Sequence, residues 1–200
     1  LTVTPTSVAE AIQQQADLIV THHPLPFQPV ARVTNETTVG QMLMDLLAAR
    51  IAVYSPHTAF DSAAAGINQF LADGLELEQI EPLTPQEDRA DVGTGRSGAC
   101  LPATTLGEMA ARVKTFLGLD SVRVVGTDDQ SVRRVAVACG SGGSLLELAA
   151  ERECDCFVSG ETTFHTCLEA EARGIGMILT GHFASERFAV ERLADELQTV

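Results

Sequence analysis

The chain has 200 residues, of which 13 are Lys or Arg and 27 are Asp or Glu, so its formal net charge is −14 at pH 7. Such an acidic surface repels phosphate backbones and anionic lipids, and we therefore expect neither a nucleic acid nor a membrane as partner. Hydrophobic residues make up 45% and charged residues 20%, as in folded proteins and unlike disordered ones. No apolar run reaches the roughly 20 residues of a membrane span. No signal peptide is evident either, so a cytoplasmic protein is expected.

The cysteines lie at positions 100, 139, 154, 156 and 167, with no CxxC pair among them. This pattern indicates neither a disulfide framework nor a zinc ribbon. Cys154 and Cys156 alternate within an apolar run and are expected to be buried. Cys139 is also expected to be buried rather than nucleophilic, because no neighbouring group activates it.

The first part of the chain alternates between helical and strand-like patterns. Apolar residues at 8, 11 and 12 have helical spacing, and the continuous apolar run at 17–20 is typical of a strand buried on both faces of a parallel sheet. One predicted helix carries three consecutive alanines at 63–65, an apolar run that favours self-association. The expected elements are helices over 6–15, 39–49 and 62–73 and strands over 17–20 and 51–54.

Residues 76–91 are acidic, contain two prolines and show little periodicity, which indicates a linker. Beyond it the pattern is that of a second α/β region. The expected elements there are strands over 93–101, 121–126, 133–138, 155–158 and 175–179 and helices over 104–117, 143–152, 163–173 and 186–198.

Two parts of the chain are similar to each other. Gln-Ala-Asp-Leu-Ile-Val-Thr at 15–21 parallels Glu-Cys-Asp-Cys-Phe-Val-Ser at 153–159, and a helix and a second strand follow each. This repeat predicts an α/β protein of two duplicated α/β/α lobes with mixed or mostly parallel sheets. We expect a first lobe at 1–75, the linker at 76–91 and a second lobe at 92–200. Ligands bind at the carboxyl ends of strands in open α/β sheets, so a site is expected there, between the lobes.

Histidines and carboxylates follow the predicted strands in both lobes. A histidine and a carboxylate about one helical turn apart can converge on one point. Imidazole and carboxylate together suit a dinuclear metal centre, in which one of the groups would support the ligands instead of binding metal. Alternatively, each motif only caps a strand or a helix. The motifs are His22-His23, His57-x-x-x-Asp61 and His182-x-x-x-Glu186.

Two further features leave a structural and a functional interpretation open. Gly160-Glu161, with His165 following, also comes after a strand, which suits either a site or a helix N-terminus favoured by Glu161. The run Gly140-Ser-Gly-Gly143 either cradles an anion with its backbone N–H groups or forms an ordinary tight turn, since it lacks the full dinucleotide or Walker pattern.

Four ordered segments carry a resemblance to a known family: Asp-Leu-Ile-Val-Thr-His-His-Pro-Leu-Pro-Phe (17–27), Ser-Pro-His-Thr-Ala-Phe-Asp (55–61), Ser-Gly-Glu-Thr-Thr-Phe-His (159–165) and Thr-Gly-His-Phe-Ala-Ser-Glu (180–186). They resemble the Nif-three-like family, whose members are often called GTP cyclohydrolase 1 type 2 homologues. The resemblance covers nearly the whole chain. It implies a duplicated α/β/α fold, a dinuclear metal centre and toroidal hexamers built from dimers. We also expect that the family's N-terminal segment and the domain that some members insert between the lobes are lacking here.

The resemblance also assigns roles to residues. It implies two divalent ions, of Zn, Fe, Mn, Co or Ni. The expected function is metal-dependent hydrolysis of a nucleotide or another small phosphorylated or cyclic compound, and the GTP cyclohydrolase label is carried by the resemblance alone. The alternative is a metal-binding regulatory, scaffold or metal-chaperone protein without turnover. The implied ligands are His22, His23, Asp61, His182 and Glu186, with His57 and His165 as pocket residues for proton transfer or ligand support.

Overall fold

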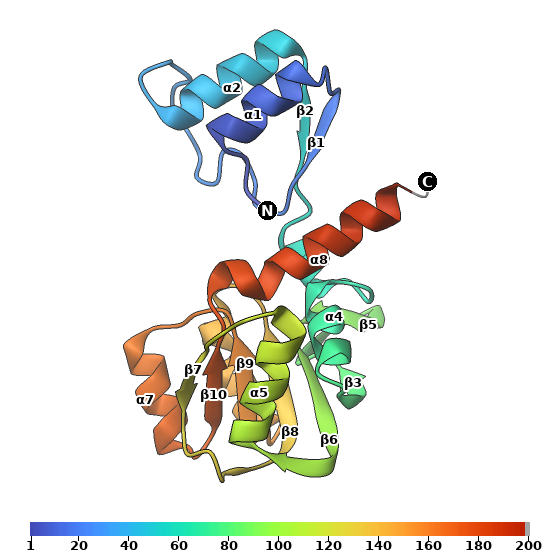
Figure 1. The fold of residues 1–200 in the computed structure, drawn as a ribbon, viewed down its shortest axis with the longest axis vertical. Helices are drawn as coiled ribbons and strands as arrows, with labels where there is room; N and C mark the ends of the chain where they lie inside the picture. The colour runs from blue at the N-terminus through green and yellow to red at the C-terminus, as the bar shows by residue number, and fades with distance from the viewer. Residues whose placement is uncertain (199–200) are drawn as a thin grey trace. The chain divides into compact units, whose positions relative to one another are not determined.

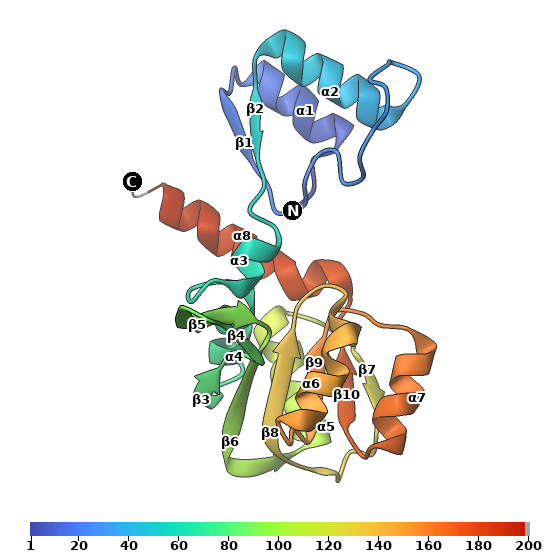
Figure 2. The same cartoon turned by 180° about the vertical axis from the view of Figure 1, so that it is seen from behind.

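The computed structural model describes residues 1–198, and the chain divides into two compact units, Leu1–Ala59 and a second that begins at Phe60. Each is a compact body with its own hydrophobic core (Figures 1 and 2). No helix in the described part is both long and apolar enough to span a membrane. The first unit contains α1 (Pro5–Gln13), β1 (Leu18–Val20), α2 (Thr38–Ala49) and β2 (Ala52–Tyr54).

Local sequence signals explain the two helices of the first unit. Thr4 caps α1 through a reciprocal capping box with Ser7, and Pro5 opens the helix where its missing N–H costs nothing. The two helices pack on one face of the parallel β1–β2 pair, on the side of Ile19 and Val53. On the opposite face of this pair, Leu18 and Tyr54 are exposed. The expected burial of 17–20 on both faces is therefore wrong: Leu18 is 50% exposed.

The second unit holds a six-stranded sheet with the order β3-β6-β8-β9-β10-β7. The central strands β8, β9 and β10 are parallel, while β7, β6 and β3 join antiparallel. Its elements are α3 (Thr58–Ser62, which crosses the division), α4 (Ile67–Gly74), β3 (Glu78–Glu81), β4 (Thr84–Gln86), β5 (Arg89–Thr94), β6 (Arg96–Thr105), α5 (Leu106–Leu117), β7 (Arg123–Val125), β8 (Ser131–Ala138), the 3₁₀ turn η1 (Gly142–Leu145), α6 (Leu146–Glu151), β9 (Cys156–Ser159), α7 (Phe164–Ala172), β10 (Gly176–Leu179) and α8 (His182–Leu197).

Helices cover both faces of this sheet, so the second unit is a three-layer α/β/α sandwich (Figures 1 and 2). Alternate strand residues enter opposite cores: Val135 and Val137 face α4 and α5, whereas Ala136 and Ala138 face α6. All residues of β9 and β10 are buried. The predicted α/β class is confirmed, with helices on both faces in this unit and on one face in the first.

The boundaries differ from the sequence-based expectation in three places. The compact units divide after Ala59 and not within 76–91, and the expected linker 76–91 instead holds β3, β4 and the start of β5. These are polar strands with mostly exposed residues, so they lack the apolar alternation that marks a strand. The single helix expected over 62–73 is split into α3 and α4, which leaves the alanine run 63–65 in a turn.

Candidate metal centre

Three histidines meet at the carboxyl ends of the two parallel strands of the first unit. Thr21 N donates to the carbonyl of Tyr54 at 2.9 Å, which places the residues after β1 beside those after β2. Each of His22, His23 and His57 offers a ring nitrogen, and these nitrogens lie within 4.8 Å of one another. We call this group the histidine cluster.

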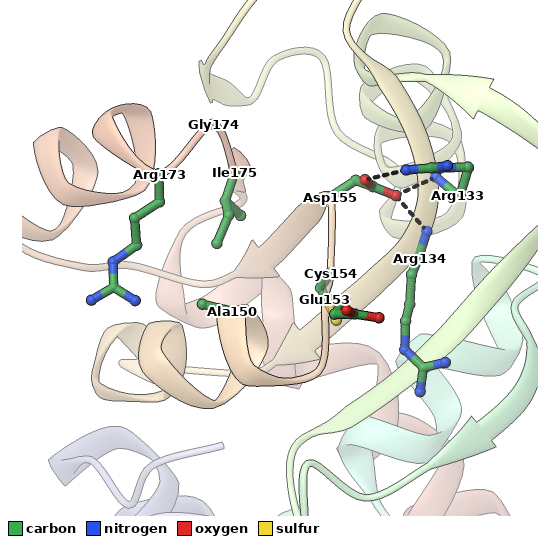
Figure 3. A pocket seen from close by; sticks show the side chains of 9 residues that line it. All are labelled: Arg133, Arg134, Ala150, Glu153, Cys154, Asp155, Arg173, Gly174 and Ile175. Carbon is green, nitrogen blue, oxygen red and sulfur yellow. Dashed lines mark hydrogen bonds and ion pairs between the residues drawn. The ribbon is translucent and has the colours of Figure 1, made fainter.

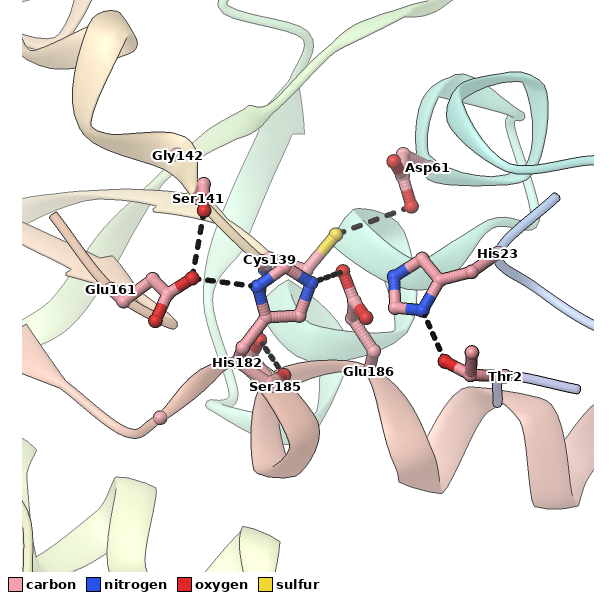
Figure 4. A network of polar contacts seen from close by, with 12 residues as sticks. Thr2, His23, Asp61, Cys139, Ser141, Gly142, Glu161, His182, Ser185 and Glu186 are labelled. Atoms are coloured by element: carbon pink, nitrogen blue, oxygen red, sulfur yellow. Dashed lines mark hydrogen bonds and ion pairs between the residues drawn. The ribbon is translucent and has the colours of Figure 1, made fainter. Parts of the chain in front are cut away.

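The backbone holds the histidine cluster firmly in place. His22 and His23 both donate their backbone N–H to the carbonyl of Leu1 at 3.0 Å, and the Thr2 hydroxyl lies 2.6 Å from Nδ1 of His23 (Figure 4). His22 is only 1% exposed. His57 has a φ of +44°, a left-handed conformation that is uncommon for any residue except glycine. Gln15 and Arg50 of this unit share such a conformation, so it is the place of His57 in the histidine cluster that makes it a candidate functional residue.

A second group lies at the carboxyl ends of the parallel strands of the second unit. His182 is the first residue of α8, where Gly181, with φ +89°, turns the chain from β10 into the helix. Glu186 follows one turn later on the same face, and its Oε1 lies 3.2 Å from His182 Nε2. On the other side of the ring, Nδ1 lies 2.9 Å from Oε1 of Glu161 (Figure 4). Glu161, His182 and Glu186 form the His–Glu cluster.

Glu161 supports the His–Glu cluster from the second residue after β9. Its Oε1 also accepts a hydrogen bond from the Ser141 hydroxyl at 2.9 Å. The hydrogen bonds from His182 and then Ser141 lower the pKa of the Glu161 carboxyl. A carboxylate on the second ring nitrogen of a histidine fixes the ring and makes it a better metal ligand. This contact with His182 favours the site interpretation of Glu161, which stays a prediction, and its position just after a buried strand was the signal.

Space at the His–Glu cluster depends on Gly140. A Cβ at this position would lie 2.5 Å from Glu186 Oε1 and 3.3 Å from His182 Nε2. Gly140 also has a φ of +59°. Its N–H donates to the Ser185 hydroxyl at 2.8 Å, and that hydroxyl donates to the carbonyl of His182 at 2.7 Å. The glycine thus leaves open the place where the two ligand atoms meet, as a cation would require.

Asp61, in α3, contacts Cys139, the residue that follows β8, and Asn68 of α4. The Cys139 thiol donates to Oδ1 of Asp61 at 3.3 Å (Figure 4). The Asn68 amide donates to the carbonyl of Asp61 at 3.1 Å. Asn68 Oδ1 accepts the backbone N–H of Cys139 at 2.8 Å. Burial, followed by the charges of Asp61 and Glu186, raises the pKa of Cys139 well above its ordinary value. The structure confirms that Cys139 is buried, and it confirms the burial of Cys154 and Cys156.

His165 differs from the other histidines. It is exposed on α7, and its ring centroid lies 5.8 Å from that of Phe164. It belongs to neither of the metal-capable groups found among residues 1–198. The donor set of the two clusters, imidazole and carboxylate, fits divalent transition metals.

A cavity of about 790 Å³ lies away from the His–Glu cluster, at the amino ends of β9 and β10 (Figure 3). Three arginines line it, but each is paired: Arg133 with Asp155, Arg134 with Glu81, and Arg173 with Glu147 and Glu169. Because ligands of such sheets bind at the opposite, carboxyl ends of the strands, the clusters are the better candidate site despite this volume.

The chain is similar to known proteins over its whole length. The family model described as Duf34/NIF3 (NGG1p interacting factor 3) matches residues 1–200. The chain belongs to this family. It is 31% identical over 192 residues to a GTP cyclohydrolase 1 type 2 homolog of Clostridium acetobutylicum, covering 96% of this chain and 72% of the relative. It is 33% identical over 202 residues to one of Nostoc sp., covering 100% and 76%.

Solved structures share the fold of this DUF34/NIF3 chain. Reduced HcgD from Methanocaldococcus jannaschii has a TM-score of 0.80 at 27% identity, covering 96% of this chain and 74% of that protein. The Staphylococcus aureus hypothetical protein SA1388 has a TM-score of 0.87 at 24% identity, covering 100% and 77%. The resemblance drawn from the four sequence segments is thereby confirmed.

Proposed function

We propose that this DUF34/NIF3 chain is a metal-dependent hydrolase of a nucleotide or another small phosphorylated or cyclic compound. The observation that carries the proposal is the pair of clusters, each built at the carboxyl ends of parallel strands from side chains that ligate divalent metals. The names of the relatives, GTP cyclohydrolase 1 type 2 homolog, support a nucleotide as substrate.

Within this proposal, both clusters serve one centre of two divalent ions, of Zn, Fe, Mn, Co or Ni. When bound, such ions supply Lewis acidity, which lowers the pKa of water and polarises the electrophile. The repeated His-x-x-x-carboxylate motif and family membership support this assignment. The proposed ligands are His22, His23, Asp61, His182 and Glu186.

The remaining polar residues take supporting roles in the proposed reaction. Glu161 holds the ring of His182 through Nδ1, which leaves Nε2 directed toward Glu186. Of the two histidines expected to transfer a proton, His57 lies within 4.8 Å of the ring nitrogens of its cluster, whereas His165 is exposed on α7. We therefore give proton transfer to His57, since a general acid or base must lie within hydrogen-bond reach of the reacting group.

We propose further that the substrate is a small molecule and that the chain is cytoplasmic and assembles into a homo-oligomer, a hexamer by family resemblance. The charge of −14 argues against nucleic acid. The alanine run 63–65 no longer supports assembly, since it lies in a turn. Light scattering at micromolar concentration measures the oligomeric state, and a monomer would contradict the assembly.

The experiment for the function measures turnover of a panel of nucleotides by the purified chain, with and without added divalent metal, alongside metal content by mass spectrometry. Metal-dependent turnover supports the hydrolase. Two metals per chain with no turnover across the panel favours the alternative, a metal-binding regulatory, scaffold or chaperone protein. Absence of bound metal after loading would overturn both.

A further inference from the structure

We propose that a pocket beside the His–Glu cluster binds the phosphate group of the substrate, with Arg123 as its principal ligand. The pocket has a volume of about 530 Å³. We call it the hydroxyl pocket, because apart from Arg123 it is lined mainly by alcohol side chains. These are Ser141, Ser144, Thr162, Thr163 and Thr166. The inference rests on the proposed function, since it names the part of the substrate that lies next to the metal ligands.

The topology places the hydroxyl pocket at the working edge of the sheet. Arg123, the first residue of β7, pairs in register with Leu179, the last residue of β10. Ser141 follows the end of β8, and Thr162 follows the end of β9. The pocket is thus assembled at the carboxyl ends of all three parallel strands, the edge at which α/β sheets bind ligands.

A short chain of hydrogen bonds joins the hydroxyl pocket to the metal ligands. Ser141 and Glu161 both line the pocket, and the Ser141 hydroxyl donates to Glu161. The same oxygen of Glu161 lies 2.9 Å from His182 Nδ1, and His182 Nε2 lies 3.2 Å from Glu186 (Figure 4). A molecule whose phosphate occupies the pocket therefore has its adjacent atoms near His182, one side chain away.

Arg123 has the character of an anion ligand. Among residues 1–198 its guanidinium forms no ion pair within 4 Å, although the chain is strongly acidic and the three arginines of the 790 Å³ cavity are all paired. A guanidinium presents a planar fork of donors that matches phosphate oxygens two at a time. Arg123 is thus the unpaired cation of the hydroxyl pocket.

The wall of the pocket is closely fitted where the glycine-rich run passes the start of α7. A Cβ on Gly143 would lie 1.8 Å from Thr162 Oγ1 and 2.6 Å from Thr162 Cβ, so only glycine lets the two segments approach. This gives the run Gly140–Gly143 a role beyond an ordinary turn: it carries Ser141 and Ser144 into the pocket against Thr162. The hydroxyls of Ser144 and Thr162 can donate to phosphate oxygens, whereas the Ser141 hydroxyl already donates to Glu161.

Glu161 opposes the binding of an anion and so provides a test with a definite sign. Its carboxylate lines the hydroxyl pocket and repels phosphate, while Arg123 attracts it. Removing the charge of Glu161 should tighten phosphate binding, and removing the charge of Arg123 should weaken it. If Arg123 and Glu161 merely maintained the fold, both variants would bind phosphate more weakly than the wild type.

The test is calorimetric titration of the full chain, as purified and again after metal removal by a chelator, with inorganic phosphate, adenosine 5′-monophosphate and adenosine. We expect phosphate and the monophosphate to bind saturably and adenosine to bind far more weakly. Arg123→Ala should weaken both phosphate ligands about tenfold or more. The phosphate affinity of Arg123→Lys should lie between those of Arg123→Ala and the wild type, because lysine keeps the positive charge but lacks the planar fork of donors. Glu161→Gln should bind phosphate and the monophosphate more tightly than the wild type does.

Arg32→Ala is the matched control, since it removes one exposed arginine from the first unit and should leave binding unchanged. Thermal melting of each variant establishes that it is folded. Equal affinity of Arg123→Ala and wild type, binding of adenosine as tight as that of its monophosphate, or absence of saturable phosphate binding would each overturn the proposal. The metal-free titration distinguishes failure of this inference from failure of the proposed function. A chain that binds phosphate without metal but never turns over substrate would contradict the proposed function and would still support the phosphate pocket.

Discussion

The two units use the same helix–strand–helix–strand repeat but bury it differently. In the first unit β1 and β2 are covered on one face, and Tyr54 is 58% exposed. In the second unit the corresponding strands β9 and β10 are central in a six-stranded sheet and buried throughout. Both repeats still end in metal-capable side chains. The repeat therefore places candidate ligands at the strand ends in both units. The burial of the strands themselves depends on how many further strands and helices each unit packs around them.

The two repeats also differ in the chemistry that they offer a metal. The histidine cluster supplies only imidazoles, which are neutral when they bind metal, while the His–Glu cluster adds carboxylates that offset cation charge. Asp61, held by Cys139 and Asn68, adds another carboxylate to the second unit. If both serve one centre, the negative charge that two divalent ions need comes entirely from the second unit.

The largest effect is expected from removing that charge. Asp61→Asn and Glu186→Gln keep the side-chain shape and remove one negative charge each, so each variant should retain at most one tightly held metal. His57→Ala should keep both metals and lose mainly activity, because we assign it to proton transfer. Metal content by mass spectrometry, on variants whose melting temperature shows them folded, measures this. Two metals retained in both carboxylate variants would defeat the dinuclear assignment, and metal loss from His57→Ala would make that residue a ligand.

The difference in burial predicts a second contrast, in stability. Phe157, fully buried in β9, should lose about 3–5 kcal/mol of unfolding free energy on replacement by alanine, because the change leaves a cavity. Leu18, half-exposed in β1 of the first repeat, should lose only about 1 kcal/mol of unfolding free energy on replacement by alanine. Urea unfolding of both variants compares them. Equal losses would mean that the open face of the first unit is covered in the folded protein.

A third prediction concerns the carboxylate that orients His182. Glu161→Gln removes the charge beside Nδ1 but leaves the metal-facing side of the ring intact, so metal affinity should fall about 10- to 100-fold. Competition with a chromogenic chelator measures this affinity. Glu147→Gln, on the exposed surface of α6, removes the same charge and should leave the affinity unchanged. A loss of the same size in both variants would indicate a general charge effect in place of ring orientation.

The sequence predicted the parts of the fold that a clear hydrophobic pattern marks. The strands β9 and β10 are continuous apolar runs because both of their faces are buried, and His182 was proposed as a ligand because it follows such a run. β3 was missed because its residues are mostly polar and exposed. The start of α8 was placed four residues late because Gly181, not a polar cap, turns the chain into it. The contact of Asp61 with Cys139 joins residues 78 positions apart, which no local pattern encodes.

The smallest effect is expected at Cys139, a neutral side chain that contacts Asp61 in the second unit. Its thiol donates to Asp61, and burial raises its pKa well above the ordinary value, so the thiol stays protonated. A thiol reagent at pH 8 should therefore leave Cys139 unmodified in the folded chain while it labels Cys167, which is partly exposed. Cys139→Ser keeps a donor for Asp61 and should cost less than about 1.5 kcal/mol of unfolding free energy, with metal content unchanged. Cys139→Ala removes the donor and should loosen Asp61, with weaker metal binding than in the serine variant. Rapid labelling of Cys139 in the folded chain, or equal metal affinity of the serine and alanine variants, would contradict a supporting role of the Cys139 thiol at Asp61.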